Sequence, residues 1–159
     1  MARTTSKESA LPSPPILAVD GPVSYALVRL AKAHRDVAGA LLRDIGLHPG
    51  QELLLMHLRD RDERTQAELG RALNLDPSTV TRMLARLEEQ GVVKQRASST
   101  DRRAVVVSLT PRGAKLCGDI RRLWTELEAA TTQGMPKRDR DDVLRTLQRM
   151  ADRLAAEDA

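Results

Sequence analysis

Two closely spaced helix starts in the middle of the chain constrain its fold most. Thr65, with Glu68 three residues later, makes a capping box, in which the two side chains satisfy free backbone N–H groups at a helix start. Asp76 is a good N-cap, and Pro77 fits the first helical position, where no amide hydrogen is needed. Asn74 ends the first helix in time for the second to begin. Two capped helices joined by a turn of a few residues predict a helix-turn-helix.

The second of these helices has two distinct faces. Its apolar residues recur at helical spacing on one face: Val80, Met83, Leu84 and Leu87. The opposite face is small, hydroxylic and basic: Ser78, Thr81, Arg82 and Ala85, with Arg86 on the flank. Such a face suits a DNA major groove, because hydroxyls bond phosphates or bases and arginine can hold guanine O6 and N7 with two hydrogen bonds. An ordinary solvated face has the same composition, so this helix alone decides nothing.

A short basic hairpin is predicted after this helix. Gly91 is a helix terminator, and residues 92–96 and 105–109 have the composition of two strands around a polar turn. From Lys94 to Arg103 there are four cations and one anion. Basic arms of this kind commonly reach a minor groove or phosphates, and a solvated loop is the alternative.

The stretches DPSTVTRMLARLEEQGVVKQR, DRRAVVVSLT and LTPRG resemble the winged-helix signature of the multiple-antibiotic-resistance repressor (MarR) family. The resemblance covers the second helix, the hairpin or wing, and the start of the next helix. It implies a dimeric transcription regulator with helices at both chain ends in the dimer interface. It also implies repression of a neighbouring gene until a small ligand or oxidant releases the DNA.

The resemblance also implies which residues contact DNA. The expected contacts lie at the start of the first helix of the pair, on the recognition helix and in the wing: Thr65, Gln66, Ser78, Thr79, Thr81, Arg82, Arg86, Arg96, Arg102 and Arg103. Asp101 is placed to orient a wing arginine by a salt bridge. The alternative for Arg82 is that it turns inward and pairs with Asp101 instead of meeting bases.

The expected fold is mainly α with a small β-hairpin wing (α+β), a winged helix-turn-helix with N- and C-terminal dimerisation helices. Residues 1–20 mix Ser, Thr, Pro and charges without periodicity, which predicts a flexible arm. Residues 21–159 are expected to form a single domain. Its DNA-binding lobe is predicted at 49–110, and its dimerisation helices at 21–45 and 111–156.

Three flanking helices carry apolar stripes. In chain order these are Val23, Leu27, Leu30, His34, Val37 and Leu41; Leu116, Ile120, Leu123, Leu127 and Ala130; and Val143, Leu147, Met150 and Leu154. A winged helix has too little groove surface to bury three such stripes. The stripes therefore most simply bury one another across a two-fold axis. The chain is therefore expected to be a homodimer.

Between the first helix and the helix-turn-helix, the sequence predicts a helix and a turn. Pro49 introduces QELLLMHLRD, a predicted buried linker helix with Leu53, Leu54, Met56 and His57 in its buried region. The run Asp60 to Arg64 is predicted to be a charged turn.

The composition narrows the class of partner. The pI of about 9.7 with a net charge of +4 is compatible with nucleic acid without being diagnostic of it. There is no Phe, one Trp and one Tyr, so base-stacking platforms for single strands are essentially missing and duplex DNA is favoured. The single cysteine excludes an intrachain disulfide, which suits a reducing cytoplasm. No apolar run approaches the roughly 20 residues that span a bilayer, so no membrane partner is expected.

The histidines and the cysteine offer little catalytic chemistry. The three histidines have no metal-site spacing, so we expect no enzyme, no metal and no cofactor. His34 and His57 lie on helices that, by the resemblance, line a cleft where a phenolic or other aromatic effector would bind, and a packed, hydrogen-bonded histidine is the alternative for each. Cys117 is expected to be ordinary packing. The rival function is a sequence-tolerant, nucleoid-associated DNA-binding protein, which needs only the basic wing.

Overall fold

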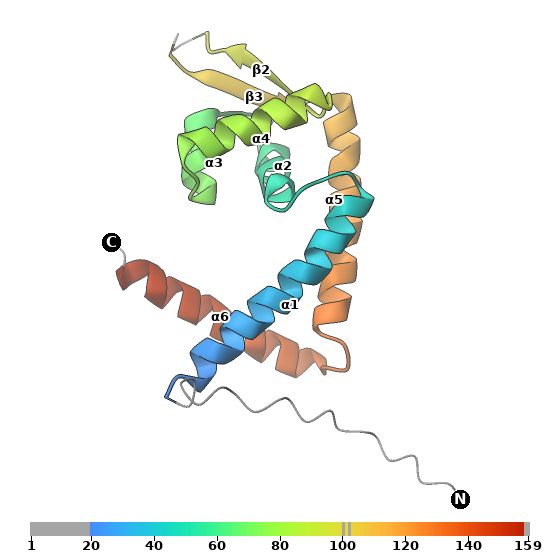
Figure 1. The fold of residues 1–159 in the computed structure, drawn as a ribbon, viewed down its shortest axis with the longest axis vertical. Helices are drawn as coiled ribbons and strands as arrows, with labels where there is room; N and C mark the ends of the chain where they lie inside the picture. The colour runs from blue at the N-terminus through green and yellow to red at the C-terminus, as the bar shows by residue number, and fades with distance from the viewer. Residues whose placement is uncertain (1–19, 100, 102, 158–159) are drawn as a thin grey trace, which may run out of the picture. The chain divides into compact units, whose positions relative to one another are not determined.

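A computed structural model describes residues 20–99, 101 and 103–157, and Figure 1 shows its helices and strands. The elements are α1 (Pro22–Asp44), α2 (Gln51–Asp60), β1 (Glu63–Thr65), α3 (Gln66–Leu73), α4 (Pro77–Glu89), β2 (Val93–Ala97), β3 (Val105–Leu109), α5 (Pro111–Thr131) and α6 (Lys137–Glu157). The chain divides into two compact units, and the boundary falls between Asp36 and Val37, inside α1.

The first unit contains the N-terminal part of α1. The helix lies within one residue of the predicted 21–45 at each end, and its first turn is closed by a bond from Tyr25 N to Gly21 O (3.0 Å). Its apolar residues are not covered: Val23 is 55% exposed and Val28 is 66% exposed. This part of the chain therefore offers an apolar face without burying it.

The second unit contains a three-stranded antiparallel sheet in the order β1-β3-β2. Arg64 of β1 and Gln95 of β2 both lie opposite Val107 of β3. The prediction of a charged turn over Asp60 to Arg64 was wrong at its end, because residues from Glu63 onward form β1. The three polar residues of β1 show no alternation of polar and apolar side chains, so it is their pairing with β3 that makes them a strand.

The core of the second unit lies among α2, α3, α4, α5 and the sheet. The prediction for the inward face of α4 is confirmed: Val80, Leu84 and Leu87 are at most 1% exposed. The prediction for α2 was partly wrong, because Leu53 and Met56 are 38% and 39% exposed while three other leucines are buried: Leu54, Leu55 and Leu58. A run of apolar residues fixes a helix without fixing which side faces inward.

The start of α5 is hydrogen-bonded to the residues that follow α4, and the two helix ends lie close together (Figure 1). Thr110 donates its backbone N–H to Val92 O (3.0 Å) and its hydroxyl to Gly91 O (2.7 Å), and its side chain accepts from Gly113 N (3.1 Å). A Cβ on Gly113 would lie 2.1 Å from the Val92 carbonyl oxygen. Only glycine fits at this crossing, which explains the glycine of the LTPRG stretch.

The last two helices differ in what they bury. On α5, Ile120, Leu123 and Leu127 are at most 5% exposed, whereas Trp124 is 37% exposed. On α6 no residue is buried, and its exposed large apolar residues are Val143, Leu144, Leu147 and Leu154. Helix α6 thus carries an apolar face that its own chain leaves uncovered.

Candidate nucleic-acid interface

The start of α4 is held by the carboxylate of Asp76. This carboxylate accepts the hydroxyl of Ser78, and from Thr79 it accepts both the backbone N–H (2.9 Å) and the hydroxyl (2.6 Å). The Ser78 hydroxyl, followed by the two donors of Thr79, holds the pKa of Asp76 far below its usual range. Asp76 is therefore ionised at the positive end of the helix, where a negative charge is favoured.

The hydroxyls on α4 that were predicted to contact DNA all donate inside the protein, to Asp76 or to the backbone of the helix. Besides Ser78 and Thr79, Thr81 donates its hydroxyl to Pro77 O (2.8 Å). A hydroxyl that donates inside the protein keeps oxygen lone pairs for an outside donor. In this geometry the three residues thus present acceptors, which suit amino groups on base edges better than phosphates.

The arginines of α4 supply the outward-facing donors. Arg82 and Arg86 are exposed, and Nη2 of Arg82 donates to the hydroxyl oxygen of Thr79 (3.2 Å). The described residues form five ion pairs, and none uses Arg82, Arg86 or Arg103. The alternative in which Arg82 turns inward to Asp101 is therefore not what the structure contains.

The start of α3 has the predicted capping box. Glu68 N donates to the Thr65 hydroxyl oxygen (3.2 Å), and Thr65 N donates to Glu68 Oε2 (2.7 Å). The backbone N–H of Thr65, followed by its hydroxyl, lowers the pKa of Glu68. The side-chain amide of Gln66, the residue after Thr65, donates to the side-chain oxygen of Gln95 in the wing (2.6 Å). Both predicted DNA contacts at this helix start thus have side-chain partners inside the protein.

The wing, the hairpin of β2 and β3, holds its charges in two different ways. Arg96 pairs with Glu63 of β1 (2.6 Å), whereas Arg103 is exposed and has no ion-pair partner among the described residues. Arg102 lies outside the described residues. The Asp101 carboxylate accepts the backbone N–H of Arg103 (2.9 Å) rather than a described guanidinium, a bond that fixes the turn. Its predicted salt bridge is thus absent from the described residues.

A groove lies between the helix-turn-helix and the wing. Its volume is about 750 Å³, and Arg71 and Arg103 stand on its walls with apolar residues such as Val80 and Val105. Arg71, in the last turn of α3, was not among the predicted contacts, since its place beside the wing depends on packing. Asp101 also lines the groove, which therefore adds a concave surface with a small excess of positive charge next to the exposed face of α4.

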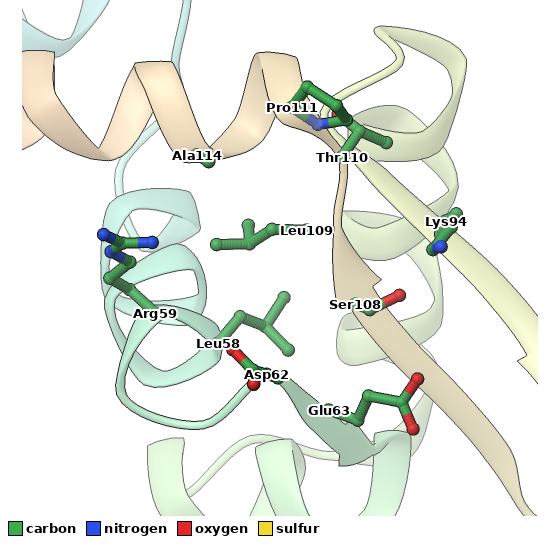
Figure 2. Close-up of a pocket in the computed structure, with 10 residues that line it drawn as sticks. All are labelled: Leu58, Arg59, Asp62, Glu63, Lys94, Ser108, Leu109, Thr110, Pro111 and Ala114. Atoms are coloured by element: carbon green, nitrogen blue, oxygen red, sulfur yellow. The ribbon is translucent and has the colours of Figure 1, made fainter.

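A smaller cavity, of about 380 Å³, opens among α2, the sheet and the start of α5. Figure 2 shows Leu58 and Leu109 in its middle, with Arg59 and Lys94 on opposite sides. Asp62 and Glu63 also line it. Cations and anions on the same rim favour neither an anionic nor a cationic ligand.

The remaining candidate residues are the cysteine and two histidines. The thiol of Cys117 packs on the core 3.8 Å from Leu55 O, and burial raises its pKa, which makes it less reactive. His34 and His57 are each half-buried, and their role at an effector site stays a prediction. Within residues 20–99, 101 and 103–157, no cluster of three metal-ligating side chains occurs. No helix in the same residues has the length and apolar character to cross a membrane.

Sequence relatives place the chain among bacterial regulators. The family model described as "MarR family" matches residues 47–105. An organic hydroperoxide resistance transcriptional regulator of Bacillus subtilis is 38% identical over 76 residues, which are 48% of this chain and 52% of that protein. The chain thus aligns with only about half the length of that relative. An HTH-type transcriptional repressor of Mycobacterium bovis is 32% identical over 100 residues, which are 63% of this chain and 72% of that protein.

Solved structures agree on the fold. A mutant MarR from E. coli complexed with operator DNA aligns with a TM-score of 0.77 at 22% identity, over 86% of this chain and 99% of that one. Bordetella bronchiseptica BpsR, whose DNA binding is regulated by 6-hydroxynicotinic acid, aligns with a TM-score of 0.73 at 25% identity, over 82% of this chain and 98% of that one. With the capped helix pair, the wing and these relatives in agreement, the chain belongs to the MarR family of transcriptional regulators.

Proposed function

We propose that the chain is a dimeric repressor that binds a pseudo-palindromic operator. Each subunit presents α4 to a major groove and its wing to the neighbouring minor groove or phosphates. Because the two subunits are identical, the half-sites lie about 10 bp apart, one turn of B-DNA. The role is regulatory, and the site of action is the cytoplasm.

The observation that carries the proposal is the exposed face of α4. Arg82 and Arg86 form no ion pair there with any residue that the structure describes, while Asp76 fixes the start of the helix. A rigid helix with free arginine donors and hydroxyl acceptors can discriminate base edges. A protein that packed DNA without regard to sequence would need only the basic wing.

The dimer follows from uncovered apolar surface. Leu144 and Leu154 of α6 are 56% and 61% exposed, as is part of the apolar surface of α1. Such a face is stabilised when a second copy buries it, and identical chains most often pair about a two-fold axis. Two recognition helices on one rigid dimer then set the spacing of the half-sites.

An aromatic effector is the regulator that we propose. BpsR, which shares the fold, is regulated by 6-hydroxynicotinic acid, an aromatic acid. An effector releases DNA if it binds better to a dimer whose two heads are wrongly spaced, which is a population shift. Thermal-shift screening of hydroxylated aromatic acids, repeated with His34→Ala and His57→Ala, tests the role of the two histidines.

The test of the function is selection of bound fragments from the genome that encodes the chain. The selected duplex is then compared with a random duplex of equal length in a gel-shift titration. We expect about a thousandfold preference or more for the selected fragment, and an inverted repeat within it. A ratio near one would contradict the proposal.

A further inference from the structure

A chain of side-chain hydrogen bonds joins α3, the wing and α4. Gln66, at the start of α3, donates through Nε2 to Oε1 of Gln95 in β2 (2.6 Å). Gln95 donates through Nε2 to Oε2 of Glu88 in α4 (2.7 Å), and its backbone N–H donates to Oε1 of the same carboxylate (2.9 Å). One carboxylate thus anchors a relay that spans the helix-turn-helix and the wing.

The backbone bond in this relay covers an open sheet edge. β2 pairs only with β3, so its other side is an edge of the sheet. The bond from Thr110 N to Val92 O places even-numbered residues of this strand in the hydrogen-bonded pairs with β3. The N–H of Gln95 therefore points off the edge, because alternate residues of an antiparallel pair turn outward. The Glu88 carboxylate accepts a hydrogen bond from this N–H, and the bond links the edge of the wing to the recognition helix.

The charge of Glu88 fixes the direction of every donor in the relay. An ionised carboxylate accepts hydrogen bonds and cannot donate. Gln95 must therefore turn its amino group to Glu88 and its oxygen to Gln66, which in turn must present its amino group. The amide oxygen of Gln66 is left over, on a residue that lines the groove between α3 and the wing.

We propose that Glu88 and Gln95 are positioning residues for DNA binding, which hold the wing at a set angle to α4 and orient the amide of Gln66. With its amino group held by Gln95, Gln66 can offer DNA only its amide oxygen, which disfavours phosphate and accepts from an exocyclic amine on a base edge. Gln66 then adds to sequence discrimination. This role rests on the proposed function, whereas the positioning of the wing does not.

The test uses an exchange of the two side chains. Glu88→Gln keeps the size but lets both amides reverse, which turns the amino group of Gln66 outward. Gln95→Glu sets two carboxylates against each other. The double variant places a carboxylate acceptor at position 95 between two amide donors, keeps the net charge and returns Gln66 to its original direction. Glu89→Gln is the matched control, because Glu89 is the exposed neighbour on the same helix.

Two measurements are made on each full-length variant. The first is the exchange rate of the Gln95 backbone amide by NMR, which needs no DNA; in the Gln95→Glu variants the amide at the same position is followed. The second is affinity for the selected genomic fragment and for a random duplex of equal length. We expect Gln95→Glu to speed this exchange about tenfold or more, because a bond to a charged group is lost.

For Glu88→Gln we expect the preference for the selected fragment to fall about tenfold while random-duplex binding holds. The double variant is expected to recover exchange and preference to within about threefold of wild type. Recovery would be hard to explain by a merely structural role for either residue.

Two results would overturn the inference. One is a Glu88→Gln protein that matches Glu89→Gln in both measurements, and the other is a double variant no better than Gln95→Glu. If wild type itself failed to discriminate between the duplexes, the proposed function would fail instead, and amide exchange would still decide whether Glu88 holds the wing.

Discussion

The head, defined as residues 51–109 from α2 to β3, and the last helix, α6, treat their apolar residues in opposite ways. In the head, Leu54, Leu69 and Leu84 are 0% exposed. On α6, Leu144 and Leu147 are 56% and 38% exposed. Apart from Leu53 and Met56 of α2, the head therefore keeps its large apolar residues from being exposed, whereas α6 has the same kind of pattern and no buried residue among those that the structure describes.

The difference has energetic consequences. Burying one leucine side chain is worth about 1.5–3 kcal/mol, so the head gains most of its stability internally. Helix α6 has exposed ion pairs of the Lys137–Asp141 kind, each worth only about 0.2–0.5 kcal/mol. The head should thus fold as a monomer, while α6 should depend on a partner.

The largest expected effect is loss of the dimer when α6 loses its apolar face. Leu144→Asp combined with Leu147→Asp should weaken dimerisation by at least about 100-fold, since two buried leucines contribute several kcal/mol. Sedimentation velocity at micromolar concentration measures it. Arg149→Asp changes the net charge by the same amount on the opposite side of the helix and should leave the dimer intact. A double variant that remained dimeric would break the contrast between α6 and the head.

The next effect concerns the point where α5 joins the head. Gly113→Ala should destabilise the head by about 3 kcal/mol, because the new Cβ would overlap the Val92 carbonyl oxygen and the backbone must move. A Cβ on Gly118, further along α5, would have no other atom within 4 Å. Gly118→Ala should therefore stabilise the helix by about 1 kcal/mol. Urea denaturation of both variants gives the two signs, and equal effects would contradict this account.

Local features were predictable from the sequence, and long-range ones were not. The caps at Thr65 and Asp76 were predicted correctly because a cap is decided by residues three positions apart. Strand β1 was missed because only its pairing with β3 makes it a strand. In the same way, the bond between Gln66 and Gln95 joins residues 29 positions apart, and no local pattern marks it.

The candidate site shows the same division. The exposed face of α4 follows from its periodicity, so Arg82 and Arg86 lie where the sequence predicted. The partners of individual side chains do not follow. Arg96 was expected to face DNA and pairs with Glu63, and Asp101 was expected to hold an arginine side chain and holds a backbone N–H. Side-chain pairing depends on register and turn geometry, which composition does not specify.

The third effect separates two parts of the head by their contribution to DNA binding. Arg82→Ala should cost about 1–3 kcal/mol on the selected fragment and much less on random duplex, because it removes a base contact. Arg103→Ala should weaken both duplexes evenly and lower the salt slope by about one, as expected for a phosphate or minor-groove contact. Fluorescence anisotropy at several salt concentrations measures both.

Asp101→Ala supplies the control for that pair. Since Asp101 bonds the backbone of Arg103 and not Arg82, its loss should follow the pattern of Arg103→Ala with a smaller effect. If Asp101→Ala instead reduced the preference as Arg82→Ala does, the base-reading assignment of Arg82 would be wrong.

The smallest effect tests whether the head needs a partner chain at Glu52, a buried carboxylate with an unpaired oxygen among the described residues. Glu52 of α2 is 9% exposed, its Oε2 has no hydrogen-bond partner among the described residues, and burial raises its pKa. A raised pKa means that the folded head holds this proton more tightly than the unfolded chain. The resulting stability is full below the ordinary carboxyl range, near pH 4, and is lost as pH rises through the raised pKa.

Glu52→Gln should therefore stabilise the protein by about 1 kcal/mol at pH 7 and have little effect at pH 4, whereas Glu89→Gln should change the stability at neither pH. Thermal unfolding at the two pH values decides the matter. Destabilisation by Glu52→Gln at pH 7 would mean that the dimer supplies a cation to this carboxylate, and the head would then depend on its partner as α6 does.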